Sequence, residues 1–374
     1  MVRVLLLGGG KIGSAIAQFL THGGDRDYDL LVGDTDRNSL KRLADSTSAR
    51  VRVIDASNQR AVRSAMKNRD LVISACSFSV NPSIAKAALD AGISYFDLTE
   101  DRHTSQTIRS LSRHAKPGQI FMPQCGLAPG FVSIAARALT RQFDQLDELR
   151  MRVGALPLFP TNEMKYNLTW STDGLINEYG NPCQAIHDGR LIEVLPLEGL
   201  EHFSLDGIDY EAFNTSGGVG TLAETLKGKV RKLDYKTIRH RGHRDLMSFL
   251  LNELRLNDHR QALKEILERA VPVTPQDVVL IFCTVWGRKD GLLTQLTDAR
   301  KVYHGEHWGR QVSAIQLTTA ASLCAVVDLH AAGRLPSRGF VRQEQVRLDE
   351  FLSNRFGRVY ATAFRPSEPA PSFQ

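Results

Sequence analysis

The sequence has few cysteines and no pattern that would tie them together. Five cysteines are spread over 374 residues, and no two of them form a Cys-x-x-Cys pair. This spacing argues against a zinc cluster and against a disulfide framework, so we expect no bound metal. A chain without disulfides suits a reducing compartment, and we expect a cytoplasmic protein.

Long apolar runs and concentrated positive charge are also missing. No run reaches the length of a membrane-spanning helix, and the chain begins directly with a strand rather than a signal peptide, so we expect no membrane association. The net charge of +6 is scattered. Its densest stretch, Lys227 to Arg244, alternates with apolar residues and has few aromatic residues, which argues against nucleic-acid binding. Hydrophobic residues make up 42% of the chain and charged ones 24%, as in ordinary globular proteins.

A glycine motif near the N-terminus predicts a dinucleotide site. The apolar strand Val4 to Leu7 runs into Gly8, Gly10 and Gly13, and a predicted helix follows over Ile12 to Leu20. This G-x-G-x-x-G spacing allows a tight turn, a close approach of backbone to a pyrophosphate, and packing of the helix on the strand. The free N–H groups and the dipole at the helix N-terminus favour phosphate.

Further residues of the first half fit the same site. Asp34 ends the next predicted strand, about twenty residues on, where a carboxylate would accept hydrogen bonds from the adenosine ribose. It favours NAD over NADP, although Arg37 lies close by. Asp55 ends a third strand and either contacts adenine or makes a turn, and Ser77 leaves the fourth strand at the crevice of the sheet. The predicted cofactor-binding residues are Gly8, Gly10, Lys11, Ile12, Gly13, Asp34, Asp55 and Ser77.

Alternating strands and helices predict the fold class. Over the first 130 residues they predict a parallel Rossmann-type sheet covered on both faces, forming a dinucleotide-binding domain. Residues 131–310 follow a different pattern, which predicts a second α+β domain on a mixed sheet for substrate binding and dimerisation. We expect a helical return onto the first domain over 311–360 and a mobile tail over 361–374. The long apolar hairpin of the second domain favours a homodimer or higher homo-oligomer.

Several polar residues are candidates for substrate chemistry. Lys165 to Ser171 alternates like a strand and would present Lys165, Asn167 and Thr169 on one face, either to solvent or to a pocket. Arg239 ends a predicted strand, and its planar guanidinium suits a substrate carboxylate. His243 at a helix start and Asp97 at the end of the fifth strand are candidates for proton transfer. Glu100 leaves the sheet at the same edge as Asp97.

Five motifs resemble the saccharopine dehydrogenase-like superfamily, and most closely its lysine 6-dehydrogenase branch. They span nearly the whole chain in the expected order. The motifs are the N-terminal GGGKIG, CGLAPGF at Cys125–Phe131, WSTDGLINEY at Trp170–Tyr179, AFNTSGGVGTL at Ala212–Leu222 and YKTIRHRGH at Tyr235–His243.

The resemblance implies an NAD(P)-dependent oxidoreductase that acts on the C–N bond of an amino acid. For the lysine 6-dehydrogenase branch this means oxidative deamination of the terminal amine through an imine. Saccharopine-forming relatives carry an acidic residue before the proline of the CGLAPGF motif, where this chain has Ala128 before Pro129. This difference disfavours saccharopine as the substrate. Two alternatives stay open: a saccharopine-, opine- or carboxynorspermidine-type dehydrogenase of secondary-amine conjugates, and a non-catalytic NAD-binding protein on the same fold.

Overall fold

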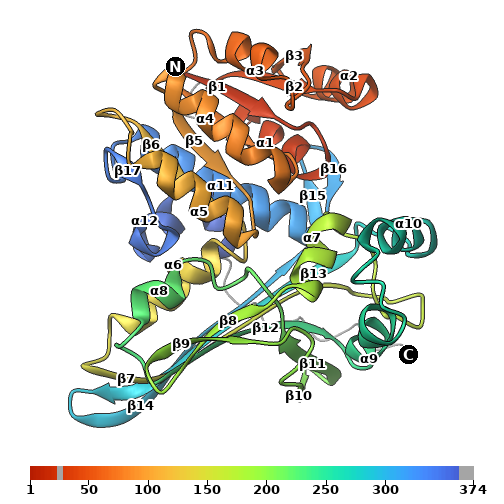
Figure 1. The fold of residues 1–374 in the computed structure, drawn as a ribbon, viewed down its shortest axis with the longest axis vertical. Helices are drawn as coiled ribbons and strands as arrows, with labels where there is room; N and C mark the ends of the chain where they lie inside the picture. The colour runs from red at the N-terminus through yellow and green to blue at the C-terminus, as the bar shows by residue number, and fades with distance from the viewer. Residues whose placement is uncertain (23–27, 362–374) are drawn as a thin grey trace, which may run out of the picture.

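The computed structural model describes residues 1–22 and 28–361, which form two large sheets and one two-stranded sheet, with helices packed on and between the large ones (Figure 1). The tail predicted over 361–374 therefore lies outside the described residues, apart from Ala361. In Figure 1 the first sheet and its helices occupy the upper part of the molecule and the second sheet the lower part.

The first sheet is entirely parallel, with strand order β17-β6-β5-β4-β1-β2-β3. Its strands are β1 (Val2–Leu7), β2 (Tyr28–Asp34), β3 (Arg50–Val53), β4 (Leu71–Ser74), β5 (Ser94–Asp97), β6 (Ile120–Met122) and β17 (Gly339–Phe340). The helices between them are α1 (Lys11–His22), α2 (Arg37–Ser46), α3 (Gln59–Met66), η1 (Phe78–Val80), α4 (Asn81–Ala91) and α5 (Arg102–Ser112). Strand order reverses between β1 and β4, where doubly wound sheets bind their ligands. The predicted Rossmann-type sheet is confirmed, and β17 adds a strand from the far end of the chain.

The second sheet is mixed, with strand order β10-β11-β12-β7-β13-β14; in addition, β8 pairs with β12, and β9 pairs with β8. Its strands are β7 (Gln145–Pro157), β8 (Cys183–His187), β9 (Arg190–Val194), β10 (Glu201–Leu205), β11 (Ile208–Asn214), β12 (Lys232–His240), β13 (Asp277–Lys289) and β14 (Leu292–Tyr303). β12 and β7 run parallel, whereas the other pairs are antiparallel. The predicted mixed sheet is confirmed. Two of its hairpins turn at Asp188-Gly189 and Asp206-Gly207, as predicted, because all four residues adopt the positive φ that such turns need.

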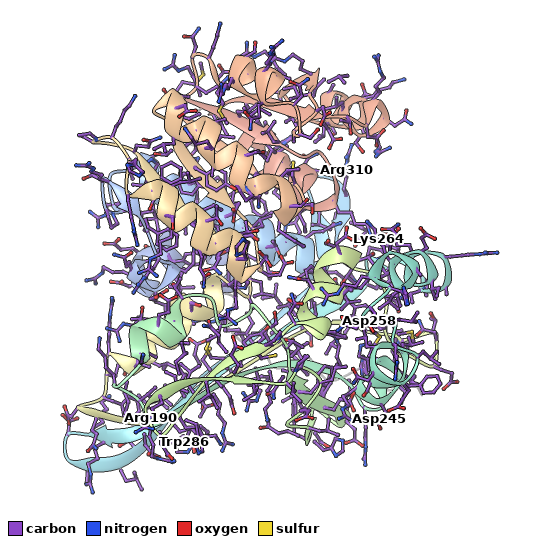
Figure 2. All side chains as sticks on the ribbon, in the orientation of Figure 1. Arg190, Asp245, Asp258, Lys264, Trp286 and Arg310 are labelled. Carbon is purple, nitrogen blue, oxygen red and sulfur yellow. The ribbon has the colours of Figure 1, made fainter. Side chains whose placement is uncertain are left out.

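Helices of the second half flank this sheet. They are α6 (Phe131–Thr140), α7 (Thr172–Gly180), α8 (Leu222–Leu226), α9 (His243–Ser248) with the π-turn η2 (Phe249–Glu253), and α10 (Arg260–Ala270). A small hairpin, β15 (Gly305–His307) and β16 (Arg310–Val312), precedes the last helices. Figure 2 shows Lys264 of α10 beside α7, where its Nζ lies 2.7 Å from Asp173 Oδ2.

The C-terminal segment returns to the first sheet. It contains α11 (Ala314–Ala331), η3 (Gln343–Gln345), α12 (Leu348–Ser353) and η4 (Gly357–Tyr360). α11 lies between the two sheets in Figure 1, where it packs on α1, and 78% of its length is buried. Within the described residues, it is the helix long and apolar enough to span a membrane, and its burial is that of a core helix. Asp277 of β13 accepts hydrogen bonds from the N–H groups of Ala314 and Ile315, so the second sheet fixes where α11 begins.

The strand predicted over Lys165 to Ser171 is wrong. This stretch is irregular, and Tyr166 to Thr169 are buried in succession instead of alternating. Trp170 Nε1 donates to Tyr166 Oη at 3.1 Å, and Leu168 packs in the small apolar core shared with α7 and α9. Tertiary packing of large side chains therefore overrides the local alternation.

Candidate functional site

The glycine loop between β1 and α1 has the shape that a dinucleotide needs. Gly8 has a φ of +98°, and a Cβ there would lie 2.7 Å from the carbonyl oxygen of Ala75. A Cβ on Gly13 would lie 2.0 Å from the carbonyl oxygen of Gly8, so glycine is needed there for helix and strand to pack. A Cβ on Gly10 would meet no protein atom within 4 Å. The protein itself therefore does not require glycine at position 10, and the open space beside it fits a bound pyrophosphate.

Asp34 lies beside this loop. Its Oδ2 accepts a hydrogen bond from the Gly9 N–H at 2.5 Å, and its Oδ1 accepts one from the Asp36 N–H at 2.8 Å. The carboxylate thus holds the loop and ends β2 at the edge where an adenosine ribose would lie. Each carboxylate oxygen has more than one lone pair, so ribose hydroxyls could still donate to it. The predicted residues at this edge fit a nicotinamide dinucleotide.

The other predicted cofactor residues differ in their surroundings. Ile12 lines the cavity described below. Lys11 Nζ donates to the carbonyl oxygen of Leu168 at 3.4 Å and so joins α1 to the second half of the chain. Asp55 is exposed, and its Oδ1 accepts hydrogen bonds from the N–H and the hydroxyl of Ser57. Of the two predicted roles, contact with adenine or formation of a turn, these bonds fit the turn. Ser77 is exposed at the start of η1, beyond β4.

A cavity of about 130 Å³ opens between the carboxyl edge of the first sheet and the second sheet. The first sheet and α1 contribute Ile12, Leu98 and Glu100, and the elbow after β6 contributes Gly126 to Pro129. The second half of the chain and α11 contribute Val153, Ala155, Trp170, Ser171, Glu178, Tyr235, Thr237, Arg239, Ile315 and Thr319. Because Ile12 adjoins the glycine loop, this cavity continues the cofactor site. Ala128, which the motif comparison singled out, is part of its wall.

Two carboxyl groups of the cavity have raised pKa values. Burial raises the pKa of Glu178 to about 8, and the nearby Glu100 carboxylate adds to the rise while Arg239 opposes it. Burial likewise raises the pKa of Glu100 to about 7. Asn177 Nδ2 donates to Glu100 at 3.4 Å. Carboxyl groups that titrate near neutrality in a cavity are suited to accepting and returning protons.

Arg239 faces these carboxyl groups from β12. It is 3% exposed, and its guanidinium lies over the ring of Tyr166, 5.1 Å from the ring centroid. Its Nε donates to Tyr179 Oη at 2.8 Å and its Nη1 to the carbonyl oxygen of Ile238 at 2.9 Å. No carboxylate lies within ion-pair distance of Arg239 among the described residues. A buried guanidinium held in this way can bind a substrate carboxylate, as the sequence predicts.

His243 does not line the cavity, which corrects its predicted role in direct proton transfer. It is fully buried, and burial lowers its pKa to about 3. Its Nδ1 lies 2.8 Å from the carbonyl oxygen of Met164, an acceptor, so Nδ1 carries the proton and Nε2 accepts from Tyr179 Oη at 3.1 Å. A one-way chain of hydrogen bonds therefore runs from Arg239 through Tyr179 to His243 and orients the guanidinium.

Asp97 also lies outside the cavity wall, in contrast to its predicted proton-transfer role. Its carboxylate is completely buried and accepts hydrogen bonds from Tyr95 Oη at 2.7 Å, from the Thr99 N–H at 2.9 Å and from the Gln124 N–H at 3.1 Å. Burial raises its pKa to about 6. With its hydrogen bonds made to the protein, Asp97 ties the end of β5 to the elbow that forms the cavity wall.

The three residues predicted on one strand face do not come together at the cavity. Lys165 is exposed, and its Nζ donates to the carbonyl oxygen of Arg241 at 3.0 Å. Asn167 and Thr169 are buried, but neither belongs to the cavity wall. No cluster of histidine, cysteine, aspartate or glutamate in residues 1–22 and 28–361 is arranged to hold a metal ion.

Glu178 is the site residue that the sequence reasoning missed. It lies within the Trp170–Tyr179 motif, in α7, directly before the tyrosine that holds Arg239. An acidic residue among apolar ones in a short helix is, by itself, a weak indication of a catalytic role. Its position inside a motif specific to a family was the available clue.

Comparison with known proteins matches both halves of the chain to one family. The model of the saccharopine dehydrogenase NADP binding domain matches residues 4–122, and that of the saccharopine dehydrogenase C-terminal domain matches residues 126–356. Mitochondrial alpha-aminoadipic semialdehyde synthase of Rattus norvegicus is 20% identical over 257 residues, covering 62% of this chain and 27% of the relative. Saccharopine dehydrogenase (NADP+, L-glutamate-forming) of Saccharomyces cerevisiae is 24% identical over 205 residues, covering 53% of this chain and 45% of the relative. The alignments thus span less than half the length of these relatives.

Two solved structures share the fold along nearly the whole chain. The apo saccharopine dehydrogenase (L-Glu forming) from Saccharomyces cerevisiae superposes with a TM-score of 0.74 at 15% identity, covering 96% of both chains. The homospermidine synthase from Legionella pneumophila, solved in complex with NAD, gives a TM-score of 0.67 at 13% identity, covering 96% of this chain and 89% of that one. At these identities the likeness establishes the fold.

Proposed function

The chain belongs to the saccharopine dehydrogenase family of NAD(P)-dependent oxidoreductases, and from this we propose that it oxidises the terminal amine of a basic amino acid, the activity of lysine 6-dehydrogenase. The observation that supports the proposal is the charge of the cavity. Among the described residues of its wall, Arg239 is the one cation and Glu100 and Glu178 are the two acids.

This charge pattern complements a free basic amino acid. Lysine carries one carboxylate and two ammonium groups, so its carboxylate would pair with Arg239 and its ammonium groups with the two glutamates. A substrate with several carboxylates, such as saccharopine, would oppose the ionisation of Glu100 and Glu178, and a single arginine would have to offset its negative charges. Ala128 adds no charge to the wall.

The glutamates would also prepare the amine for oxidation. A lysine ammonium has a pKa of about 10.4 in water. The carbon that bears the amine releases hydride only when the amine is neutral, because the nitrogen lone pair then forms the C=N bond of the imine. Glu178, whose pKa burial raises to about 8, would accept that proton. Help of this kind contributes roughly 10² to 10⁴ in rate. A nicotinamide coenzyme held at the glycine loop and Asp34 would supply the hydride acceptor. Arg239, aligned by Tyr179, would anchor the carboxylate and so fix which carbon faces that coenzyme.

NAD is the coenzyme we propose, because Asp34 stands where a 2′-phosphate would meet a like charge. The family model that covers this region is described as an NADP binding domain, so both coenzymes belong in every assay.

The test is a panel of substrates with purified protein and both coenzymes. We expect coenzyme reduction with L-lysine or a close basic amino acid, and loss of that activity, with retained coenzyme binding, in Glu178→Gln. Turnover limited to saccharopine or another secondary-amine conjugate would replace the proposal by the conjugate-dehydrogenase alternative. Tight coenzyme binding with no turnover on any amine would favour the non-catalytic alternative.

A further inference from the structure

A second cavity lies on the side of α5 and α6, and its wall is dominated by arginine. Its volume is about 350 Å³, and it shares no lining residue with the cavity that contains Arg239. The wall comes from α5, α6, the end of α8 and the segment from β17 through η3. Its residues are Arg109, Arg137, Arg141, Thr225, Phe340, Arg342, Glu344 and Gln345.

Two of the four arginines have an acidic partner. Arg109 Nη1 lies 2.6 Å from Glu224 Oε2, and Arg342 Nη2 lies 3.6 Å from the same oxygen. Arg342 Nη1 also donates to Thr225 Oγ1 at 2.9 Å. One glutamate thus serves two guanidinium groups.

Glu344, the acid within the wall, is engaged by hydroxyl groups instead. Thr221 Oγ1 donates to its carboxylate at 2.9 Å and 3.0 Å, and the Thr225 hydroxyl donates to it as well. Glu344 is 3% exposed, and no arginine of the described chain forms an ion pair with it.

Arg137 and Arg141 are therefore left without an ion pair among the described residues. Arg137 Nη1 donates to the neutral Thr140 hydroxyl at 3.3 Å. Burial lowers the pKa of Arg137 and repulsion from Arg141 lowers it further, while attraction from Glu344 opposes the change. Arg137 and Arg141 are one helical turn apart and face a cavity whose one acid in the described part of the chain, Glu344, forms no ion pair with them. They therefore form a site of excess positive charge.

We propose that this cavity binds an anion with the chemistry of a phosphate group. Four arginines and the two glutamates, Glu224 and Glu344, leave a net charge of +2, which a phosphate dianion balances. Planar guanidinium groups bind phosphate through paired hydrogen bonds, which a single carboxylate would not satisfy as fully. The ligand is either free phosphate or the phosphate group of a small ester. This site is separate from the proposed amine oxidation and does not depend on it.

The experiment is calorimetric titration of the full chain saturated with NADH, so that the glycine loop is already filled. Inorganic phosphate and glycerol 3-phosphate are the two probes. We expect saturable binding of at least one probe. Stronger binding of phosphate identifies the free ion as the ligand class, and stronger binding of glycerol 3-phosphate identifies an ester.

Arg137→Gln and Arg141→Gln test whether the anion binds in this cavity, and Arg113→Gln is the matched control. Arg113 is an exposed arginine at the end of α5 with no part in the cavity wall. We expect each cavity variant to weaken binding at least about tenfold, and the control to leave it unchanged. Arg141 is exposed, so its replacement should preserve the fold even if Arg137→Gln does not. Equal affinity in all three variants, or no binding of either probe by the unmodified chain, would overturn the proposal.

Discussion

At Gly10, cofactor binding requires glycine but the fold does not, so a substitution there tests the two roles separately. It is the one described glycine at which an added methyl group meets no atom within 4 Å and the backbone is not left-handed. We therefore expect Gly10→Ala to change the free energy of unfolding by less than about 0.5 kcal/mol. In the bound state the methyl group would push the pyrophosphate away from the backbone N–H groups. Loss of one such charge-assisted hydrogen bond costs about 1.5–3 kcal/mol, which is roughly a 10- to 150-fold weaker coenzyme affinity.

Gly13→Ala should behave in the opposite way. Its methyl group would lie 2.0 Å from the Gly8 carbonyl oxygen, so strand and helix must separate. We expect this variant to lose about 1–3 kcal/mol of stability or more. Chemical denaturation measures stability and calorimetry measures coenzyme affinity, with Gly305→Ala as a control far from the loop, where the new methyl group meets ordinary contacts. If Gly10→Ala bound the coenzyme as tightly as the unmodified chain, the assignment of this loop would be wrong.

Five further predictions concern the cavity, the coenzyme preference and the assembly. Arg239→Ala should raise the KM for the amino acid far more than the KM for the coenzyme, since it removes the anchor of the carboxylate; steady-state kinetics would show an unchanged substrate KM if Arg239 were only structural. The kcat/KM for the amino acid should rise with pH through about 8, where Glu178 of the substrate-free protein loses its proton, and this rise should be absent from the residual activity of Glu178→Gln. The same raised pKa means that the coenzyme-free protein loses stability as the pH rises from the unfolded value of about 4.3 through 8, so Glu178→Gln should flatten that decline in a series of melting curves. Asp34→Ser should improve the preference for NADP relative to NAD by at least tenfold in kcat/KM, because it removes the negative charge beside the 2′ position; an unchanged ratio would leave the preference unexplained. Finally, β14 is an edge strand of the second sheet, and Leu292 and Leu293 at its start are 71% and 82% exposed. We therefore expect light scattering to report a homodimer or larger assembly. A monomer at micromolar concentration would contradict this.

The parts that sequence reasoning predicts well are set by short-range rules. Gly8 is needed because its φ is +98°, and Gly13 is needed because a Cβ there would meet the Gly8 carbonyl oxygen of the same strand-turn-helix unit. The strand that ends in Asp34 contains the apolar run Leu30 to Val32. The hairpin turn at Asp206 and Gly207 likewise follows from the conformations that these residues tolerate.

The parts that it misses depend on contacts between distant segments. His243 has the chemistry of a proton shuttle, but Tyr179 and Met164, both far from it in sequence, bury it and fix its tautomer. Asp97 likewise has the chemistry of a proton acceptor, but its carboxylate accepts a hydrogen bond from the Gln124 N–H of the elbow, which is distant in sequence. Glu178 becomes a candidate base because the fold buries it near Glu100 and Arg239. These neighbours are distant in sequence, so no local sequence pattern predicts them.

The fate of the hydrogen on the terminal carbon of lysine tests the central proposal most directly. With L-lysine deuterated at that carbon, we predict a primary isotope effect on the rate and one deuterium per turnover in the reduced coenzyme. Deuterium appearing in the coenzyme only when the label is on the α-carbon, or no transfer from either position, would contradict the proposal that this cavity presents the terminal amine for oxidation.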